Sequence, residues 1–301
     1  MSEYDMTEKM KNAGQRPQLV WGYAGPWYGQ LIPYKGDPFQ ERLEFLAKYS
    51  LKVASAGLDE IAKLEPARRE WLGQFLRDHD MQLCPVVGWD FVGADDDEAR
   101  RKADDTVQKL QELMPLLHGT IVTCVPYDEN RFDRKRPVSE KLERLSRSLT
   151  PIAQAAHELG TPLGVENHGE YYVSELVQIC QNTPHLGIFL DTGNTYLIAE
   201  KPWPAFVEAA PYTIGTHFKD HRVRPRPDAS PLHFEVAGSV LGEGDVPLRE
   251  CYELLLQHAP HPDKLVMEIE MISPEDMDPL ECFRKSLAFV RSLEQNQEVQ
   301  A

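Results

Sequence analysis

Short strand-like runs alternate with longer amphipathic stretches along almost the whole chain. The expected strands span residues 18–23, 51–56, 81–87, 120–125, 164–166, 188–191, 213–217 and 265–268. The expected helices span residues 39–49, 58–79, 95–117, 138–159, 173–182, 203–210, 246–258 and 279–293. Strict alternation is typical of parallel β structure, because the chain can begin another parallel strand only after a long crossover. Eight units favour an α/β fold of the closed (β/α)8 type, a TIM barrel.

The length of 301 residues suits one such barrel, which takes about 250 residues plus insertions. Residues 1–17 are polar and are expected to form an N-terminal tail, and residues 18–301 to form a single barrel domain, since no linker divides them. An open, doubly wound sheet is the structural alternative. It is disfavoured because no Gly-x-Gly-x-x-Gly motif follows the first strand.

The chain carries a net charge of −16, from 48 acidic and 32 basic residues. A field of that sign repels nucleic-acid backbones and anionic membrane surfaces, so neither is an expected partner. No apolar run approaches the roughly 20 residues that a bilayer crossing needs. The five cysteines are scattered and form no Cys-x-x-Cys pair, as is typical of reduced thiols. A cytoplasmic protein is therefore expected, and a homo-oligomer is left open.

Four of the expected strands end in side chains that bind metals: Glu166, Asp191, His217 and Glu268. The carboxyl ends of parallel barrel strands meet at one face, so these four side chains should converge. Three carboxylates and one imidazole form a mostly oxygen set, which suits Mn²⁺, Mg²⁺ or Co²⁺ better than a structural zinc. The sequence therefore predicts one divalent metal ion with coordination positions left for a substrate. Glu270 lies two residues after Glu268 and would share its face of the strand, so spacing alone does not separate the two.

Four short motifs in the second half carry a resemblance to a known family. They are Val-Glu-Asn-His-Gly at 165–169, Leu-Asp-Thr-Gly-Asn at 190–194, His-Phe-Lys-Asp at 217–220 and Met-Glu-Ile-Glu at 267–270. Together they resemble the sugar phosphate isomerase/epimerase family of xylose isomerase-like TIM barrels. That family includes ketose 3-epimerases, hydroxypyruvate isomerase and inosose dehydratase. The first half of the chain is similar to it only in architecture.

The resemblance implies that the metal ligands are Glu166, Asp191, His217 and Glu268, and it favours Glu268 over Glu270. It also implies an isomerase or epimerase that acts on a sugar or cyclitol through a metal-stabilised enediolate. Glu166 and Glu268 would be the acid/base pair, and His168 would orient a hydroxyl or carry a proton. Mn²⁺ is the favoured ion, with Mg²⁺, Co²⁺ or Zn²⁺ as alternatives.

Two positions depart from the patterns of related enzymes. Asn194 stands where the ketose 3-epimerases and the related nucleases usually carry a histidine. Asp228 is followed by Ala229 and Ser230, so the Asp-x-His pair of the multi-zinc nucleases is missing and a single-metal site is favoured. The alternative function is a lyase on the same metal, either a dehydratase or a keto-glycoside eliminase. A barrel that binds a ligand without turnover is the third hypothesis.

Four residues are predicted to contact the substrate. They are Lys219 and Asn194 near the ligand strands, Trp27 in an aromatic loop after the first strand, and Arg222 in the basic stretch 222–226. Aromatic rings can cover the apolar face of a sugar, and a guanidinium can bind a phosphate or a carboxylate. The substrate is therefore expected to be a small sugar or cyclitol, with or without an anionic group.

Overall fold

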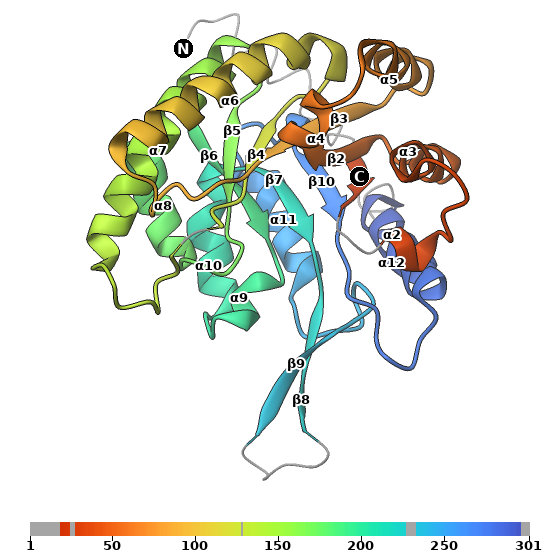
Figure 1. The fold of residues 1–301 in the computed structure, drawn as a ribbon. Coiled ribbons are helices and arrows are strands. Elements are labelled where there is room, and N and C mark those ends of the chain that lie inside the picture. Colours follow the sequence, from red (N-terminus) through yellow and green to blue (C-terminus); the bar gives the residue numbers. More distant parts are fainter. Residues whose placement is uncertain (1–18, 25–27, 128, 227–232, 296–301) are drawn as a thin grey trace, which may run out of the picture.

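Eight parallel strands close into a barrel in the computed structural model, which describes residues 19–24, 28–127, 129–226 and 233–295 (Figure 1). The strands are β1 (Val20–Tyr23), β2 (Val53–Gly57), β3 (Gln82–Val87), β4 (Val122–Cys124), β5 (Leu163–Glu166), β6 (Leu186–Asp191), β7 (Thr213–Phe218) and β10 (Val266–Ile269). They are ordered β1-β10-β7-β6-β5-β4-β3-β2, and every neighbouring pair is parallel. The predicted single-domain (β/α)8 barrel is confirmed. The predicted tail, residues 1–17, lies outside the described residues.

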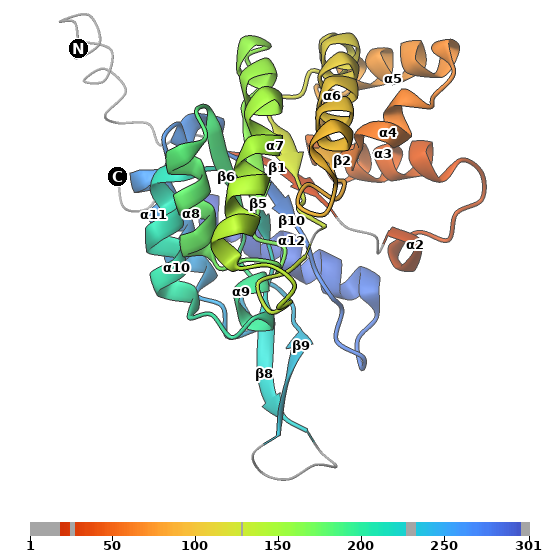
Figure 2. The same cartoon turned by 60° about the vertical axis from the view of Figure 1, so that its left-hand side comes forward.

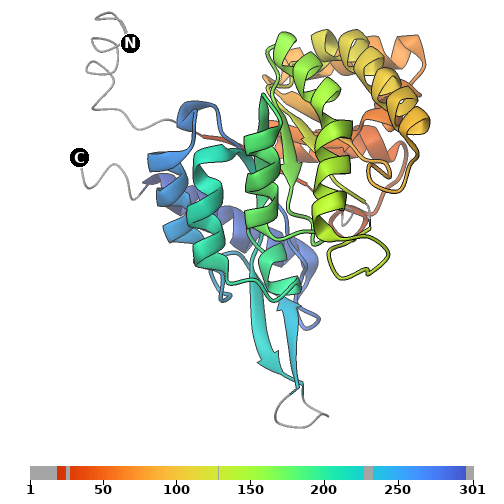
Figure 3. The ribbon, with the colours of Figure 1, turned by 90° about the vertical axis from the view of Figure 1, so that its left-hand side faces the viewer.

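Helices surround the barrel on its outer side (Figures 2 and 3). They are α2 (Tyr28–Leu31), α3 (Pro38–Lys48), α4 (Leu58–Ala62), α5 (Pro66–Asp78), α6 (Asp96–Leu117), α7 (Val138–Glu158), α8 (Val173–Asn182), α9 (Asn194–Leu197), α10 (Pro202–Ala209), α11 (Leu248–His258) and α12 (Pro279–Gln295), with short 3₁₀ turns at Ala210–Tyr212 and Pro262–Lys264. One predicted helix, 58–79, is two helices, because Pro66 has no N–H to continue α4 and instead begins α5.

The barrel wall is densely packed at the seam where β1 meets β2. Gly22 pairs with Val53 there, and a β-carbon on Gly22 would lie 2.3 Å from the Val53 carbonyl oxygen. Only glycine fits this approach. The cysteines are all buried and free, in agreement with the predicted reduced thiols.

An antiparallel hairpin of β8 (His221–Pro225) and β9 (Phe234–Gly238) leaves the barrel directly after β7. In Figures 1 and 3 it projects from the body as an arm. The sequence predicted only a loop for part of this segment, residues 222–226. None of the helices in the described part of the chain is both long and apolar enough to cross a membrane.

Candidate metal centre

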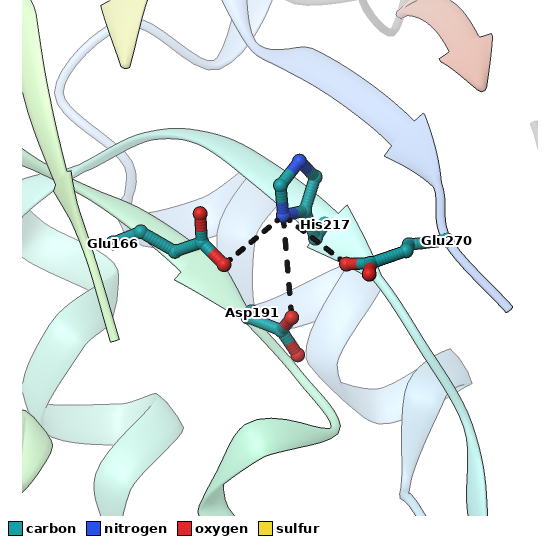
Figure 4. Close-up of side chains that lie close together, drawn as sticks. All are labelled: Glu166, Asp191, His217 and Glu270. Atoms are coloured by element: carbon teal, nitrogen blue, oxygen red, sulfur yellow. Dashed lines mark hydrogen bonds and ion pairs between the residues drawn. The ribbon is translucent and has the colours of Figure 1, made fainter. Parts of the chain in front are cut away.

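Four side chains from four neighbouring strands converge at the carboxyl end of the barrel (Figure 4). They are Glu166 at the end of β5, Asp191 at the end of β6, His217 in β7 and Glu270 just after β10. One ligand atom from each lies within 4.8 Å of the others. His217 Nδ1 lies 3.2 Å from Glu166 Oε1, 3.2 Å from Glu270 Oε2 and 4.0 Å from Asp191 Oδ2. These distances are short enough for one ion to contact all four groups.

The glutamate after β10 that belongs to this cluster is Glu270, whereas the sequence predicted Glu268. The Glu268 side chain is fully buried and accepts a hydrogen bond from Ser55 Oγ, which lies 2.9 Å from Oε1 and 2.7 Å from Oε2. Its Oε2 lies 3.7 Å from His217 Nε2, the nitrogen on the other side of the ring from the cluster. Both glutamates face the barrel interior because residues two apart share a strand face, but Glu268 lies one step deeper. In this arrangement Glu268 lies outside the cluster of four side chains.

Local hydrogen bonds explain how Asp191 is oriented. Its Oδ1 accepts from the backbone N–H groups of Gly193 and Asn194, at 2.8 and 2.9 Å. The amide of Asn167 holds the strand end, because it accepts from the Asp191 N–H at 2.7 Å and donates to the Asp191 carbonyl at 2.8 Å. The other carboxylate oxygen, Oδ2, is thereby turned toward the cluster.

Lys219 and Asn194 lie next to the carboxylates. Lys219 Nζ is buried and donates to Asp191 Oδ2 at 2.7 Å, lies 2.9 Å from Glu270 Oε2 and contacts Asn194 Oδ1 at 3.2 Å. In the described structure, the buried Asn194 Nδ2 has no hydrogen-bond partner. Lys219 thus contacts the carboxylates of the cluster and Asn194 contacts Lys219, but neither residue lines the cavity described below, so their predicted contact with a substrate stays a prediction.

The carboxylates of the cluster stabilise positive charge on the groups beside them. Burial alone would lower the pKa of His217, but the charges of Glu166 and Glu270 outweigh it and raise the pKa well above its ordinary value. Burial raises the pKa of the Asp191 carboxyl, against the opposing charge of Lys219. Burial likewise opposes the charge of Lys219, yet Asp191 and Glu270 raise its pKa. A divalent ion could take the place of these protons, and the mostly oxygen donor set fits such an ion.

A cavity of about 820 Å³ opens above the cluster. His168 lines it, in contact with Glu170 (Nδ1 to Oε1, 3.1 Å) and edge-on to Tyr127 with 5.2 Å between ring centroids. The hydrogen bond that His168 donates to Glu170 raises the pKa of His168. Other lining residues, which sequence reasoning missed, include Tyr127, Arg42, Trp89 and Ile272. Trp89 and Tyr127 follow the ends of β3 and β4, and this position after a barrel strand is the sequence signal that could have identified them as cavity residues.

Of the predicted substrate contacts, Arg222 does not line the cavity, and Trp27 cannot be placed. Arg222 lies on β8, where it is exposed and its guanidinium donates to the Glu243 carbonyl; it is not among the described residues that line the cavity. The reason is that residues 221–225 form a projecting strand and not a loop over the barrel mouth. Trp27 lies outside the described residues, so its predicted contact stays a prediction.

A parallel eight-stranded barrel with this acidic cluster at its mouth defines a TIM barrel with a candidate metal centre. The chain belongs to the xylose isomerase-like TIM barrel family, whose model matches residues 33–293. None of the curated proteins matches its sequence.

Several solved structures share the fold. D-psicose 3-epimerase with D-tagatose from Clostridium cellulolyticum H10 is 15% identical, with a TM-score of 0.66 over 92% of this chain and 99% of that one. The 3-keto-D-glucoside 4-epimerase YcjR from E. coli is 15% identical, with a TM-score of 0.65, and the match covers 91% of this chain and 100% of that one. The IolI protein with a bound zinc atom is 13% identical, with a TM-score of 0.66, and the match covers 92% of this chain and 98% of that one.

Proposed function

We propose that the protein is an isomerase or epimerase of a sugar or sugar-like polyol that depends on one divalent metal ion. The observation that carries the proposal is the position of Glu166 and Glu270. Their carboxylates approach His217 Nδ1 from opposite sides, each at 3.2 Å, in a cluster that opens to the 820 Å³ cavity (Figure 4). Membership of the xylose isomerase-like family and a fold shared with two sugar epimerases support it.

The residues that would hold the ion are Glu166, Asp191, His217 and Glu270. Glu270 replaces Glu268 in the set that the sequence predicted. When bound, a divalent ion would polarise a carbonyl and the adjacent hydroxyl of the substrate, and would stabilise the charge of an enediolate. The oxygen-rich set keeps Mn²⁺ as the favoured ion, with Mg²⁺, Co²⁺ or Zn²⁺ as alternatives.

Glu166 and Glu270 are the proposed acid/base pair. Because they lie on opposite sides of the cluster, one can remove a proton from one face of a substrate carbon. The other can return a proton to the opposite face or to the neighbouring carbon. His168 at the cavity wall would donate a hydrogen bond to a substrate hydroxyl, and Tyr127 and Trp89 would cover the apolar face of the ring.

Proton transfer next to a carbonyl gives a direct test. The Mn²⁺-loaded protein is incubated in D₂O with a panel of ketoses, inososes and keto-glycosides, and proton NMR follows loss of the C–H signal beside the carbonyl. The wild type should exchange this proton in at least one substrate, and Glu166→Gln and Glu270→Gln should abolish the exchange. Glu143→Gln, at an exposed position on α7, is the matched control and should exchange at the wild-type rate.

Other outcomes would overturn the proposal. A new ultraviolet absorption from a C=C bond would mean that the protein is a lyase on the same site. Metal binding without exchange in any substrate would favour a barrel that binds its ligand without turnover.

A further inference from the structure

The cavity above the metal cluster extends across the mouth of the barrel. Glu166, His217 and Glu270 line it at one end, and they belong to β5, β7 and the segment after β10. At its other end the cavity is lined by residues of α4 and α6, which follow β2 and β3. In the order of the closed barrel, β2 and β3 lie opposite the strands of the cluster. We call this second end the distal end, and its charged lining residues are Asp59, Glu60, Lys102 and Asp105.

The cavity is larger than one sugar ring needs. Its volume is about 820 Å³. Cavities of roughly 300–1,000 Å³ enclose drug-sized ligands, whereas a hexose has only about 12 non-hydrogen atoms. Lys102 Nζ lies 5.5 Å from the centroid of the Trp89 ring, which is proposed above to cover the reacting sugar. The distal end thus begins beside that ring, and a sugar held at the cluster leaves the distal end for a second group.

The distal end offers hydrogen-bonding groups in fixed positions. Lys109, from α6, donates to Asp59 Oδ1 at 2.8 Å and also to Asp105 Oδ2. This contact ties α4 to α6 and holds two carboxylates of the distal end in place. Each carboxylate has a second oxygen that can accept from a hydroxyl group, and the Lys102 ammonium can donate to one. Such a set suits a ligand that carries many hydroxyl groups.

The charges of the cavity disfavour a phosphate group on that ligand. Outside the cluster, three of the described lining residues carry basic groups, and each already has a carboxylate partner. The pairs are Arg42–Glu60 at 2.7 Å, Lys102–Glu98 at 2.9 Å and His168–Glu170 at 3.1 Å. A phosphate binds to arginine or lysine donors, so it would have to displace these partners, and it would also meet the negative charges of Asp59 and Asp105. A neutral second group avoids both effects.

We infer that the substrate is an uncharged glycoside and not a sugar phosphate. The reacting sugar occupies the cluster end of the cavity, and a second sugar unit, joined to it by a glycosidic bond, occupies the distal end. The inference rests on the proposed function, which places the reacting sugar at the metal cluster. Hydrogen bonds to Asp59, Lys102 and Asp105 then select substrates that carry the second unit.

Titration calorimetry with the full-length, Mn²⁺-loaded protein tests this substrate class. The probes share one ketose: D-fructose alone, fructose 6-phosphate, and fructose that carries glucose on O3, O4 or O6 (turanose, maltulose and isomaltulose). At least one disaccharide should bind at least about 10-fold more tightly than fructose, as expected for added hydrogen bonds to charged groups. Fructose 6-phosphate should bind no more tightly than fructose. If no disaccharide gains this much, or if the phosphate binds most tightly, the inference is overturned.

Matched double variants on α6 locate the second sugar unit. Lys102→Ala/Asp105→Ala should lower the ratio of disaccharide affinity to fructose affinity at least about 10-fold, because donors and acceptors of the distal end are lost. Arg101→Ala/Asp104→Ala is the control, since it removes the same pair of charges one residue earlier on the helix, at exposed positions that do not line this cavity. Its ratio should match the wild type. Equal ratios in all three proteins would mean that the second unit lies elsewhere, which also contradicts the inference.

Proton exchange in D₂O separates this inference from the proposed function. Exchange in fructose without a preference for any disaccharide would support the proposed function and contradict the inference. A disaccharide preference that Lys102→Ala/Asp105→Ala abolishes, without exchange in any substrate, would support the distal end as a binding site and overturn the proposed function.

Discussion

Glu268 and Glu270 approach opposite nitrogens of the same imidazole. Glu270 Oε2 lies 3.2 Å from His217 Nδ1, whereas Glu268 Oε2 lies 3.7 Å from His217 Nε2. The Ser55 hydroxyl, whose hydrogen bond is shared by both carboxylate oxygens, holds Glu268 in that position. Nδ1 is therefore the nitrogen that faces the cluster, and Glu268 lies behind the ring. A carboxylate behind a metal-binding histidine commonly fixes its orientation.

This geometry predicts different metal affinities for two glutamine variants. Glu270→Gln should weaken Mn²⁺ binding strongly, because a ligand carboxylate is lost. Glu268→Gln should weaken it less, by about 10–100-fold, the range seen for outer partners of metal-binding histidines. Titration calorimetry of the two variants gives the comparison. A larger loss of Mn²⁺ affinity in Glu268→Gln than in Glu270→Gln would mean that Glu268 is the ligand.

The position of the Lys219 ammonium beside two carboxylates of the cluster predicts a link between metal binding and the stability of the fold. Its ammonium lies 2.7 Å from Asp191 Oδ2 and 2.9 Å from Glu270 Oε2, all three groups being largely buried. Lys219→Met leaves these carboxylates without that cation, so the metal-free protein should lose about 3–5 kcal/mol in unfolding free energy. Saturating Mn²⁺ should then raise the melting temperature more in this variant than in the wild type.

Lys285→Met is the control for that experiment. Lys285 is exposed and lies 3.8 Å from Glu243, a surface ion pair worth at most about 1 kcal/mol. Its stability and its response to Mn²⁺ should match the wild type. Equal stabilisation of all three proteins by Mn²⁺ would contradict the proposed place of Lys219 beside the metal.

The sequence predicted the barrel well because strand and helix periodicities are local. The expected helix 138–159, for example, is α7 at Val138–Glu158. It could not choose between Glu268 and Glu270, because both positions satisfy the same two-residue period. That choice depends on Ser55, 213 residues away in the chain, which holds Glu268 deeper in the barrel. Side-chain contacts across such separations leave no periodic signal.

The arm was missed for a different physical reason. A buried strand can be recognised from its apolar run, but residues 222–225 of β8 are all exposed. Their alternation of arginine with Val223 and Pro225 was visible, but it was interpreted as a basic loop near the site. Arg222 was consequently predicted to contact the substrate. A short polar–apolar alternation next to a barrel strand is the signal that could have corrected this.

The close approach of β1 and β2 at Gly22 predicts that a larger side chain there destabilises the barrel. Gly22→Ala would place a methyl group 2.3 Å from the Val53 carbonyl oxygen, so β1 and β2 must separate. Overpacking of this kind costs about 1–3 kcal/mol, and urea unfolding should show the loss. Gly29→Ala is the control, since the nearest atom to its β-carbon would be 3.8 Å away in the Tyr34 ring. An unchanged midpoint for Gly22→Ala would mean that the seam is looser than the structure shows.

Glu200 predicts a pH dependence of stability. Its carboxylate accepts a hydrogen bond from the Val173 N–H at 3.0 Å, at the start of α8. Burial raises its pKa from 4.5 to about 7, helped by the nearby charges of Glu175 and Glu208. Between these two values the folded protein holds a proton that the unfolded chain has released. Its contribution to stability is therefore full below pH 4.5 and is lost as the pH rises through about 7.

Glu200→Gln removes this dependence, because the amide stays neutral and its oxygen can still accept from Val173. At pH 4.5 the variant and the wild type should have the same unfolding free energy. As the pH rises to 7.5, the variant should become increasingly more stable than the wild type. Since Glu200 is partly exposed, the gain should be well below the full value that its pKa shift implies. Glu143→Gln, exposed on α7, should show a difference from the wild type that does not change with pH. A constant difference for Glu200→Gln as well would mean that the carboxylate is ionised in the folded protein throughout this range.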